Sequence, residues 1–301
     1  MDRFEAMSVL LTVVEAGSLS AGARRLGMPL ATVSRRVADL EAHLHARLLN
    51  RTSRRLTLTD AGRSYVAAAR RILEDVGEAE RAAAGEYSAP KGELIITAPI
   101  VFGRLHVLPV VIDFLRAYPE IDIRLVQADR LIDLVENHVD LALRIAELPD
   151  STMVATRVGT IRRVICASPA YLAERGTPRS PEDLSSHDCI TFEGLTGPTI
   201  WDFTRDGTSA AIPIRSRLVT NTAEAAVDAA VSGLGITRVL SYQVADAIRA
   251  GRLVPALRAY EPAPAPVSLV YPGRGLLPLK LRAFLDFAAP RLRERLAALP
   301  V

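Results

Sequence analysis

The sequence predicts three consecutive parts: a small winged helix-turn-helix domain, one long linker helix, and an α/β domain with two lobes. Three observations predict this order. Short apolar stripes at helical spacing flank Gly27, an amphipathic stripe runs from residue 60 to about residue 86, and strand-like segments alternate with helices from Leu94 onward. With 301 residues, 49% of them hydrophobic and 24% charged, the chain is long enough for two or three globular domains.

Three helices are expected within residues 1–60. The first ends near Gly17, and the second spans about residues 20–26 before Gly27 permits a sharp turn. The third buries four apolar residues on one face: Val33, Val37, Leu40 and Leu44. The opposite, N-terminal side is the side that a recognition helix presents to a DNA major groove, and it holds Ala31, Thr32, Ser34 and Arg35.

The basic charge of the chain is concentrated beside this third helix. Residues 18–55 contain eight arginines and two acids, a formal charge of +6, whereas the whole chain carries only +3. Alternating apolar and basic residues over 48–58, around Thr52 and Ser53, predict a β-hairpin or wing whose guanidinium groups can reach phosphates or a minor groove. The alternative is that these arginines form an ordinary solvated face.

A long helix is expected over residues 60–86. Its apolar stripe follows spacings of three and four and consists of Ala61, Tyr65, Ala68, Ile72, Val76 and Ala79. This pattern favours a self-pairing dimerisation helix, and the alternative is that the stripe packs on its own domain. The sequence SAPKG at residues 88–92 breaks the helix, so the domains are predicted to be 1–60, the linker 61–90, and 91–301.

Strands and helices alternate beyond this boundary. We expect strands over 94–97, 121–126 and 139–144, helices over 105–116 and 131–137, and a further strand–helix–strand unit over 218–238. Such alternation predicts parallel sheet in two lobes. The chain is predicted to enter lobe II near residue 162 and to return near residue 267 through two hinge strands, so lobe I comprises 91–161 and 267–301 and lobe II comprises 162–266.

Several function classes lack their sequence signatures. There is no GxxxxGK, GxSxG or GxGxxG motif, and the five histidines are scattered, with His43 and His45 too close along a helix to face one metal ion together. The only lysines are Lys91 in the linker and Lys280 in the last helix, which argues against a Schiff-base cofactor. We therefore expect no enzyme activity, no cofactor and no metal site.

The cysteines and the N-terminal residues indicate the cellular compartment in which the protein is expected. Cys166 and Cys189 lie far from any histidine pair, which fits reducing conditions. The N-terminal residues lack the features of a signal peptide, and no apolar run approaches eighteen residues. We expect a cytoplasmic protein without a membrane partner, which argues against an exported solute-binding protein.

Residues 4–62 include the ungapped run AGSLSAGARRLGMPLATVSRRVADLEAHLHARLLNRTSRRLTLTDAG, which closely resembles the DNA-binding domain of the LysR-type transcriptional regulators. The segments HVDLALRIAELPDS, VICASPAYLAERGTP and SGLGITRVLSYQVADAIRAGRLVPAL resemble that family's effector-binding domain. The resemblance implies a homodimer or homotetramer on promoter DNA and a periplasmic-binding-protein-like domain that senses a small molecule. RNA polymerase is a candidate further partner.

The resemblance places base contacts on Leu30, Ala31, Ser34 and Arg35, with wing contacts from three further arginines: Arg51, Arg54 and Arg55. Arg35 can offer two parallel donors to a guanine, with a phosphate contact as the alternative. Thr32 can contact either a base or the backbone, and Arg36, one step around the helix, is expected to reach the DNA backbone. Where many members have Ser-Pro, this chain has Pro29-Leu30, and proline suits a first helical turn.

The effector site is expected beyond the carboxyl ends of the strands. The candidate residues at these ends are Thr97, Ala98, Pro99, Ile100, Phe102, Ala128, Asp129, Arg144, Asn221 and Thr222. The family resemblance adds Trp201 and Phe203 as lining residues. Free amides after Pro99 and Asn221 favour an organic acid as effector. Arg144 could instead pair with Asp140 or Glu147, and Trp201 could be a plain core residue.

Overall fold

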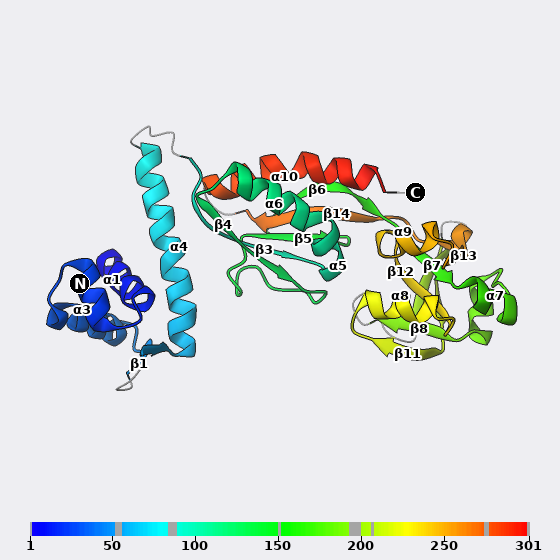
Figure 1. Ribbon diagram of the computed structural model, residues 1–301, viewed down its shortest axis with the longest axis horizontal. Helices are drawn as coiled ribbons and strands as arrows, with labels where there is room; N and C mark the ends of the chain where they lie inside the picture. Colours follow the sequence, from blue (N-terminus) through cyan, green and yellow to red (C-terminus); the bar gives the residue numbers. More distant parts are fainter. Residues whose placement is uncertain are drawn as a thin grey trace. The chain divides into compact units, whose positions relative to one another are not determined.

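The computed structural model describes residues 2–51, 56–83, 89–149, 152–192, 200–205, 208–273 and 277–299. The chain separates into two compact units, Met1–Gly92 and Glu93–Val301, and Figure 1 shows their elements. Within the described ranges no single helix is long and apolar enough to cross a membrane, and only the first two helices taken together, with a 120° bend between them, meet that criterion.

The first unit contains four helices and a short hairpin in its described part. Its elements are α1 (Arg3–Glu15), α2 (Leu19–Leu26), α3 (Leu30–His43), β1 (Leu49–Arg51), β2 (Leu56–Leu58) and α4 (Asp60–Ala83). Asp2 and Ser18 accept hydrogen bonds from the first amides of α1 and α2, as N-cap residues do. Gly27 ends α2 with a φ of +63°, so the predicted turn is left-handed and needs its glycine.

One apolar core holds α1, α2, α3 and the hairpin together. The predicted stripe of α3 supplies Val33, Val37 and Leu40, all at most 1% exposed. Gly22 allows α2 to approach α1, because a Cβ atom there would lie 2.7 Å from a methyl carbon of Val13. This close packing fixes how α3 stands on the domain.

The buried face of α4 differs from the predicted stripe by one position. Val66 and Ala69 are buried, and α4 packs against α1, whereas Ala61 is exposed and Ile72 is 40% exposed. The cause is Gly62: a Cβ atom at this position would lie 2.0 Å from the carbonyl oxygen of Leu48, so only glycine lets the helix turn this face to the domain. The first half of α4 therefore packs on its own domain.

Lobe I of the second unit is built on a five-stranded sheet in the order β4-β3-β5-β14-β6. These strands are β3 (Gly92–Ala98), β4 (Ile121–Gln127), β5 (Leu141–Ile145), β6 (Met153–Ile161) and β14 (Ala265–Pro272). The helix predicted over 105–116 begins five residues earlier: α5 (Ile100–Phe102), a π-helical turn (Gly103–Val107) and α6 (Leu108–Ala117) follow one another directly. With α10 (Leu279–Ala297), this helical segment packs on the sheet (Figure 1).

Lobe II has a second five-stranded sheet in the order β11-β8-β12-β7-β13. Its strands are β7 (Arg163–Ala167), β8 (Cys189–Phe192), β11 (Ser216–Thr220), β12 (Ile236–Leu240) and β13 (Val254–Ala256). One face packs on α8 (Ala223–Val231) and α9 (Ser241–Arg249). The other face packs on α7 (Pro169–Arg175) and on the hairpin of β9 (Ile200–Arg205) and β10 (Thr208–Pro213).

Two expectations for this unit are wrong. Both sheets are mixed rather than parallel, because the two segments that join the lobes enter antiparallel: β14 runs against β5 and β6, and β7 runs against β12. The segment 131–137 forms turns rather than a helix. The carboxylate of Asp133 accepts the amides of Val135 and Glu136, and His138 then adopts a left-handed φ of +56°, which ends the turn.

The lobes are joined by two crossings. The chain leaves lobe I after β6, enters lobe II with β7, and returns between β13 and β14. Ala265 in β14 pairs with Ile161 in β6, so the two crossings lie beside each other. This arrangement is the two-stranded connection on which hinge motions of two-lobed domains depend.

Candidate DNA-binding surface and effector site

The N-terminal half of α3 presents a solvent-facing surface on the first unit. Leu30 is 47% exposed, Ala31 and Arg35 are exposed, and Thr32 and Ser34 are half-buried. The opposite face of the same helix is the buried stripe of the core. These five side chains therefore lie on the side of α3 that a partner can reach.

The first turn of α3 carries no competing acidic group. Pro29 is the N-cap rather than a residue of the first turn, and no side chain caps the helix. The carbonyl of Pro29 accepts the amides of Thr32 and Val33, at 3.0 and 3.2 Å. An uncapped helix start with a positive dipole end suits a phosphate oxygen.

Arg36 is engaged within the domain. It forms an ion pair with Glu5 of α1, and its guanidinium donates to the sulfur of Met28 at 3.9 Å. Its side chain is only 28% exposed, compared with the exposed Arg35 beside it. In the structure Arg36 thus connects α3 to α1, and its contact with the DNA backbone stays a prediction.

The wing is anchored by a carboxylate on α3. Glu41 accepts the backbone amides of Leu48 and Leu49, at 2.8 and 3.0 Å, where the chain enters β1. Strands β1 and β2 then pair antiparallel, as the alternating pattern predicted. The tip of the hairpin with Arg54 and Arg55, together with the side chain of Arg51, lies outside the described residues.

The effector candidates of lobe I gather where β3 and β4 end. The carbonyl of Ala98 accepts the amide of Ala128 at 3.0 Å, and the amide of Ile100 donates to the carboxylate of Asp129 at 3.0 Å. Thr97 and Ala98 are 1% exposed. Sequence reasoning therefore brings together strand ends that do meet in space.

These contacts correct the idea of free amides at the helix starts. Asp129 already occupies the amide of Ile100, and the hydroxyl of Thr222 accepts the amide of Ala225 at the start of α8. The guanidinium of Arg144 donates to the carbonyl of Ile132 at 2.6 Å. Asp129 and Thr222 thus each occupy one of the amides on which the expectation of an organic acid rests, and the nature of the effector stays a prediction.

Trp201 and Phe203 are core residues of lobe II, each 1% exposed. They lie in the cluster on the α7 face of the sheet, whereas the residues that meet lobe I lie on the α8 and α9 face. The guanidinium of Arg238 lies 5.3 Å from the centre of the Trp201 ring and donates to the carbonyl of Asp202. Their expected place in the effector site is therefore wrong, and the core alternative for Trp201 is correct.

Of the residues through which the lobes touch, sequence reasoning selected Phe102 and missed the other four. The ring of Tyr242 on α9 lies 5.5 Å from that of Phe102 and 5.6 Å from that of His106, and Arg104 lies 3.7 Å from Glu224 on α8. Tyr242 follows the carboxyl end of β12, so the rule that selected the other strand ends applied there too. We call Phe102, Arg104, His106, Glu224 and Tyr242 the interlobe cluster.

Burial shapes the electrostatics at this junction. It raises the pKa of Asp129, an effect that the hydrogen bond from Ile100 opposes and the charge of Glu224 increases. Burial also raises the pKa of Tyr242, and Asp129 and Glu224 add to that effect. The pKa of His106 falls to about 4, chiefly through burial and further through the charge of Arg295.

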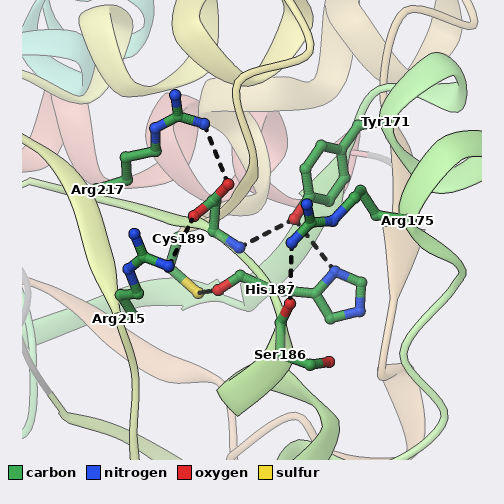
Figure 2. Close-up of polar contacts among 8 residues, drawn as sticks. Tyr171, Arg175, Ser186, His187, Cys189, Arg215 and Arg217 are labelled. Carbon is green, nitrogen blue, oxygen red and sulfur yellow. Dashed lines mark hydrogen bonds and ion pairs between the residues drawn. The ribbon is translucent and has the colours of Figure 1, made fainter.

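A separate polar cluster fixes the α7 side of lobe II (Figure 2). The hydroxyl of Tyr171 accepts the amide of Asp188 at 3.0 Å and lies 3.2 Å from Nδ1 of His187. The carboxylate of Asp188 pairs with Arg217 at 3.1 Å and with Arg215 at 3.9 Å. These contacts tie α7 to β8 and β11, and we assign them a structural role.

The exposed face of α3 beside an anchored wing, followed by a two-lobed α/β domain, defines a helix-turn-helix DNA-binding regulator with a ligand-sensing domain. Residues 4–63 match the family model of the bacterial regulatory helix-turn-helix protein, lysR family, and residues 88–293 match that of the LysR substrate binding domain. The chain belongs to the LysR family of transcriptional regulators. Members of this family are regulators rather than enzymes; they bind DNA and small-molecule effectors and form oligomers.

Relatives match along nearly the whole chain. An HTH-type transcriptional repressor from Pseudomonas aeruginosa is 36% identical over 98% of this chain and 93% of its own, and the regulator CrgA from Neisseria meningitidis is 36% identical over 97% and 98%. The solved structure of CrgA has a TM-score of 0.61 at 34% identity, over 96% of this chain and 98% of that one. The full-length virulence activator AphB of Vibrio cholerae has a TM-score of 0.61 at 28% identity, over 95% and 98%. The predicted fold class and the predicted function as a DNA-binding regulator are confirmed.

Proposed function

We propose that this regulator reads its operator through the exposed face of α3, with Arg35 in contact with a base. The observation that supports this is the contrast between two neighbouring arginines. Arg36 is held by Glu5, whereas Arg35 is exposed beside Ala31 and Ser34 at an uncapped helix start. A free guanidinium on a recognition helix can form two parallel hydrogen bonds to a guanine.

Selection of duplexes from a random DNA pool by the purified full-length protein tests this proposal. We expect enrichment of one partly symmetric sequence with two half-sites about one helical turn, or a multiple of it, apart. Recovery of duplexes without any shared sequence would contradict it, because contacts confined to phosphates carry no base information.

We further propose that the protein acts as a homodimer or a homotetramer through the exposed stripe of α4. Ile72 is 40% exposed, although it lies on a helix whose other face is packed on its own domain. Sedimentation of the full-length protein should show a dimer or tetramer, and Ile72→Glu should shift it toward smaller species while Ile72→Leu does not. Unchanged sedimentation of Ile72→Glu would exclude this part of α4 from the interface.

The proposed effector site lies between the lobes, at Ile100, Phe102 and Asp129 of lobe I and at Asn221 and Thr222 of lobe II. It is supported by the meeting of strand ends described above and by the paired crossings, which allow the lobes to move relative to each other. We expect the protein in the cytoplasm with its promoter DNA, and RNA polymerase remains a proposed partner there.

A further inference from the structure

Leu48 is bonded at both of its backbone groups, to α3 on one side and to the start of α4 on the other. Its amide donates to Oε1 of Glu41 on α3 at 2.8 Å, and the same oxygen accepts the amide of Leu49 at 3.0 Å. The carbonyl of Leu48 accepts the amide of Thr59, the residue before α4, at 3.0 Å. The side chain of Leu48 is 1% exposed and belongs to the core of the first unit. One buried residue thus connects α3 with α4.

The hydroxyl of Thr59 fixes the first turn of α4. It donates to the carbonyl of Arg47 at 2.6 Å and accepts the amide of Gly62 at 2.9 Å, as an N-cap residue does. Gly62 in turn approaches Leu48 so closely that a Cβ atom at this glycine would lie 2.0 Å from the carbonyl oxygen. The first turn of α4 is therefore held directly against Leu48. We call Glu41, Leu48, Thr59 and Gly62 the Leu48 network.

Helix α1 provides a second connection, because it packs against both α3 and α4. The contact is made largely by apolar side chains, whose attraction has no preferred direction. On the α4 side it includes an ion pair between Arg70 and Glu15 at 3.4 Å, in which both side chains are exposed, and such pairs contribute little. Hydrogen bonds to a carboxylate, in contrast, are short and directional. The Leu48 network therefore restricts the angle between α3 and α4 more sharply than the α1 contact does.

We propose that the Leu48 network fixes the angle between α3 and α4 and thereby determines the spacing of the two half-sites that a dimer recognises. This inference rests on the proposed function, in which α3 reads DNA and α4 pairs two protomers. When α4 pairs the protomers, the angle between α3 and α4 in each of them sets the distance between the two recognition helices. Glu41 and Thr59 are then positioning residues, which act on specificity through the placement of α3 rather than through contact with a base.

The length of α4 makes the half-site spacing sensitive to this angle. The helix has 24 residues, and at the usual rise per residue it is about 36 Å long. A rotation of about 5° at its first turn displaces its far end by about 3 Å, which is about the rise of one base pair. A small gain of freedom at Leu48 therefore lets a dimer accept half-sites at more than one spacing.

Two pairs of variants of the full-length protein test both ends of the network. Glu41→Ala removes the acceptor of two backbone amides, whereas Glu41→Gln keeps an oxygen for them. Thr59→Val removes the hydroxyl, whereas Thr59→Ser keeps it. Asp39→Ala is the matched control, because Asp39 is an exposed carboxylate on the same helix and its removal changes the charge by the same amount as Glu41→Ala.

Binding is measured by fluorescence anisotropy on the selected operator and on duplexes with one, two or three base pairs inserted or removed between the half-sites. We expect wild type to bind the altered spacings about tenfold or more weakly. Glu41→Ala and Thr59→Val should reduce this ratio about threefold or more, whereas Glu41→Gln, Thr59→Ser and Asp39→Ala should keep it. A variant that is only partly folded binds all duplexes more weakly by the same factor, so loss of stability alone does not change the ratio.

Ratios that stay at the wild-type value in both Glu41→Ala and Thr59→Val would overturn the inference, and so would an equal fall in Asp39→Ala. In either case a wild type that selects one spacing still supports the proposed function, and only the role of the network is wrong. Wild-type protein that binds every spacing equally well would contradict both the inference and the proposed reading of two half-sites. If Glu41→Ala does not fold, Thr59→Val decides alone.

Discussion

The buried His106 ring should make the second unit less stable in mild acid. Its folded-state pKa is about 4, whereas the unfolded chain has the ordinary value of about 6.5. Between these two values the unfolded state holds more protons, so stability falls as the pH is lowered from about 6.5 toward 4. At pH 5 the full difference would cost about 2 kcal/mol relative to pH 7, and partial solvent screening reduces the expected cost to about 1 to 1.5 kcal/mol.

The measurement is urea unfolding at pH 7 and pH 5, followed by the fluorescence of Trp201. This is the single tryptophan of the chain, and it is buried in lobe II. Other groups titrate as well, so the test is the difference between wild-type protein and His106→Phe, which cannot take up the proton. We expect the variant to lose about 1 to 1.5 kcal/mol less than wild type between the two pH values. Equal losses in both proteins would refute the reasoning.

Three further outcomes are expected. Tyr171→Phe, which removes an acceptor from a buried amide, should lower the stability of the second unit by about 1 to 2 kcal/mol in the same fluorescence assay, and an unchanged midpoint would contradict the role assigned to its hydroxyl. Gly62→Ala, which places a Cβ atom against a backbone oxygen, should cost the first unit about 1 to 3 kcal/mol by circular dichroism, whereas Ala61→Ser should not. Burial raises the pKa of Cys166 and of Cys189 to about 12, so neither thiol should react with iodoacetamide at pH 8 before the protein is unfolded, and rapid labelling of folded protein would contradict this.

The first unit was predictable because its signals are local. The spacing of Val33, Val37 and Leu40 selects one face of α3, and Gly27 marks the left-handed turn before it. The predicted buried face of α4 was wrong because it depends on a contact between two residues that are distant in the sequence. The approach of Gly62 to the carbonyl of Leu48 decides which side of the helix is buried, and helical periodicity alone does not contain that contact.

The candidate effector residues were only partly predictable, again because contacts between residues distant in the sequence decide how these residues lie. The strand-end rule selected Ile100 and Asp129, which lie together in the structure, but it could not show that the carboxylate of Asp129 accepts the amide of Ile100. Trp201 was misplaced because nothing in the sequence tells which face of the lobe II sheet the β9–β10 hairpin covers. The segment 131–137 was misread because Asp133 bonds its own neighbouring amides, which competes with helix formation.

The contrast between Arg35 and its neighbour Arg36 also supplies the sharpest test of how the protein reads DNA. After an operator has been selected, the binding of wild type, Arg35→Ala and Arg24→Ala is measured on a panel of duplexes that carry every single-base change. Arg24 is a suitable control because it is an exposed arginine on α2. If α3 reads the operator as proposed, Arg35→Ala loses about 1 to 3 kcal/mol of discrimination at one base position of each half-site, and Arg24→Ala does not. Uniform weakening across the panel, with discrimination retained at every position, would show that Arg35 contacts only phosphate and would contradict the proposed base contact.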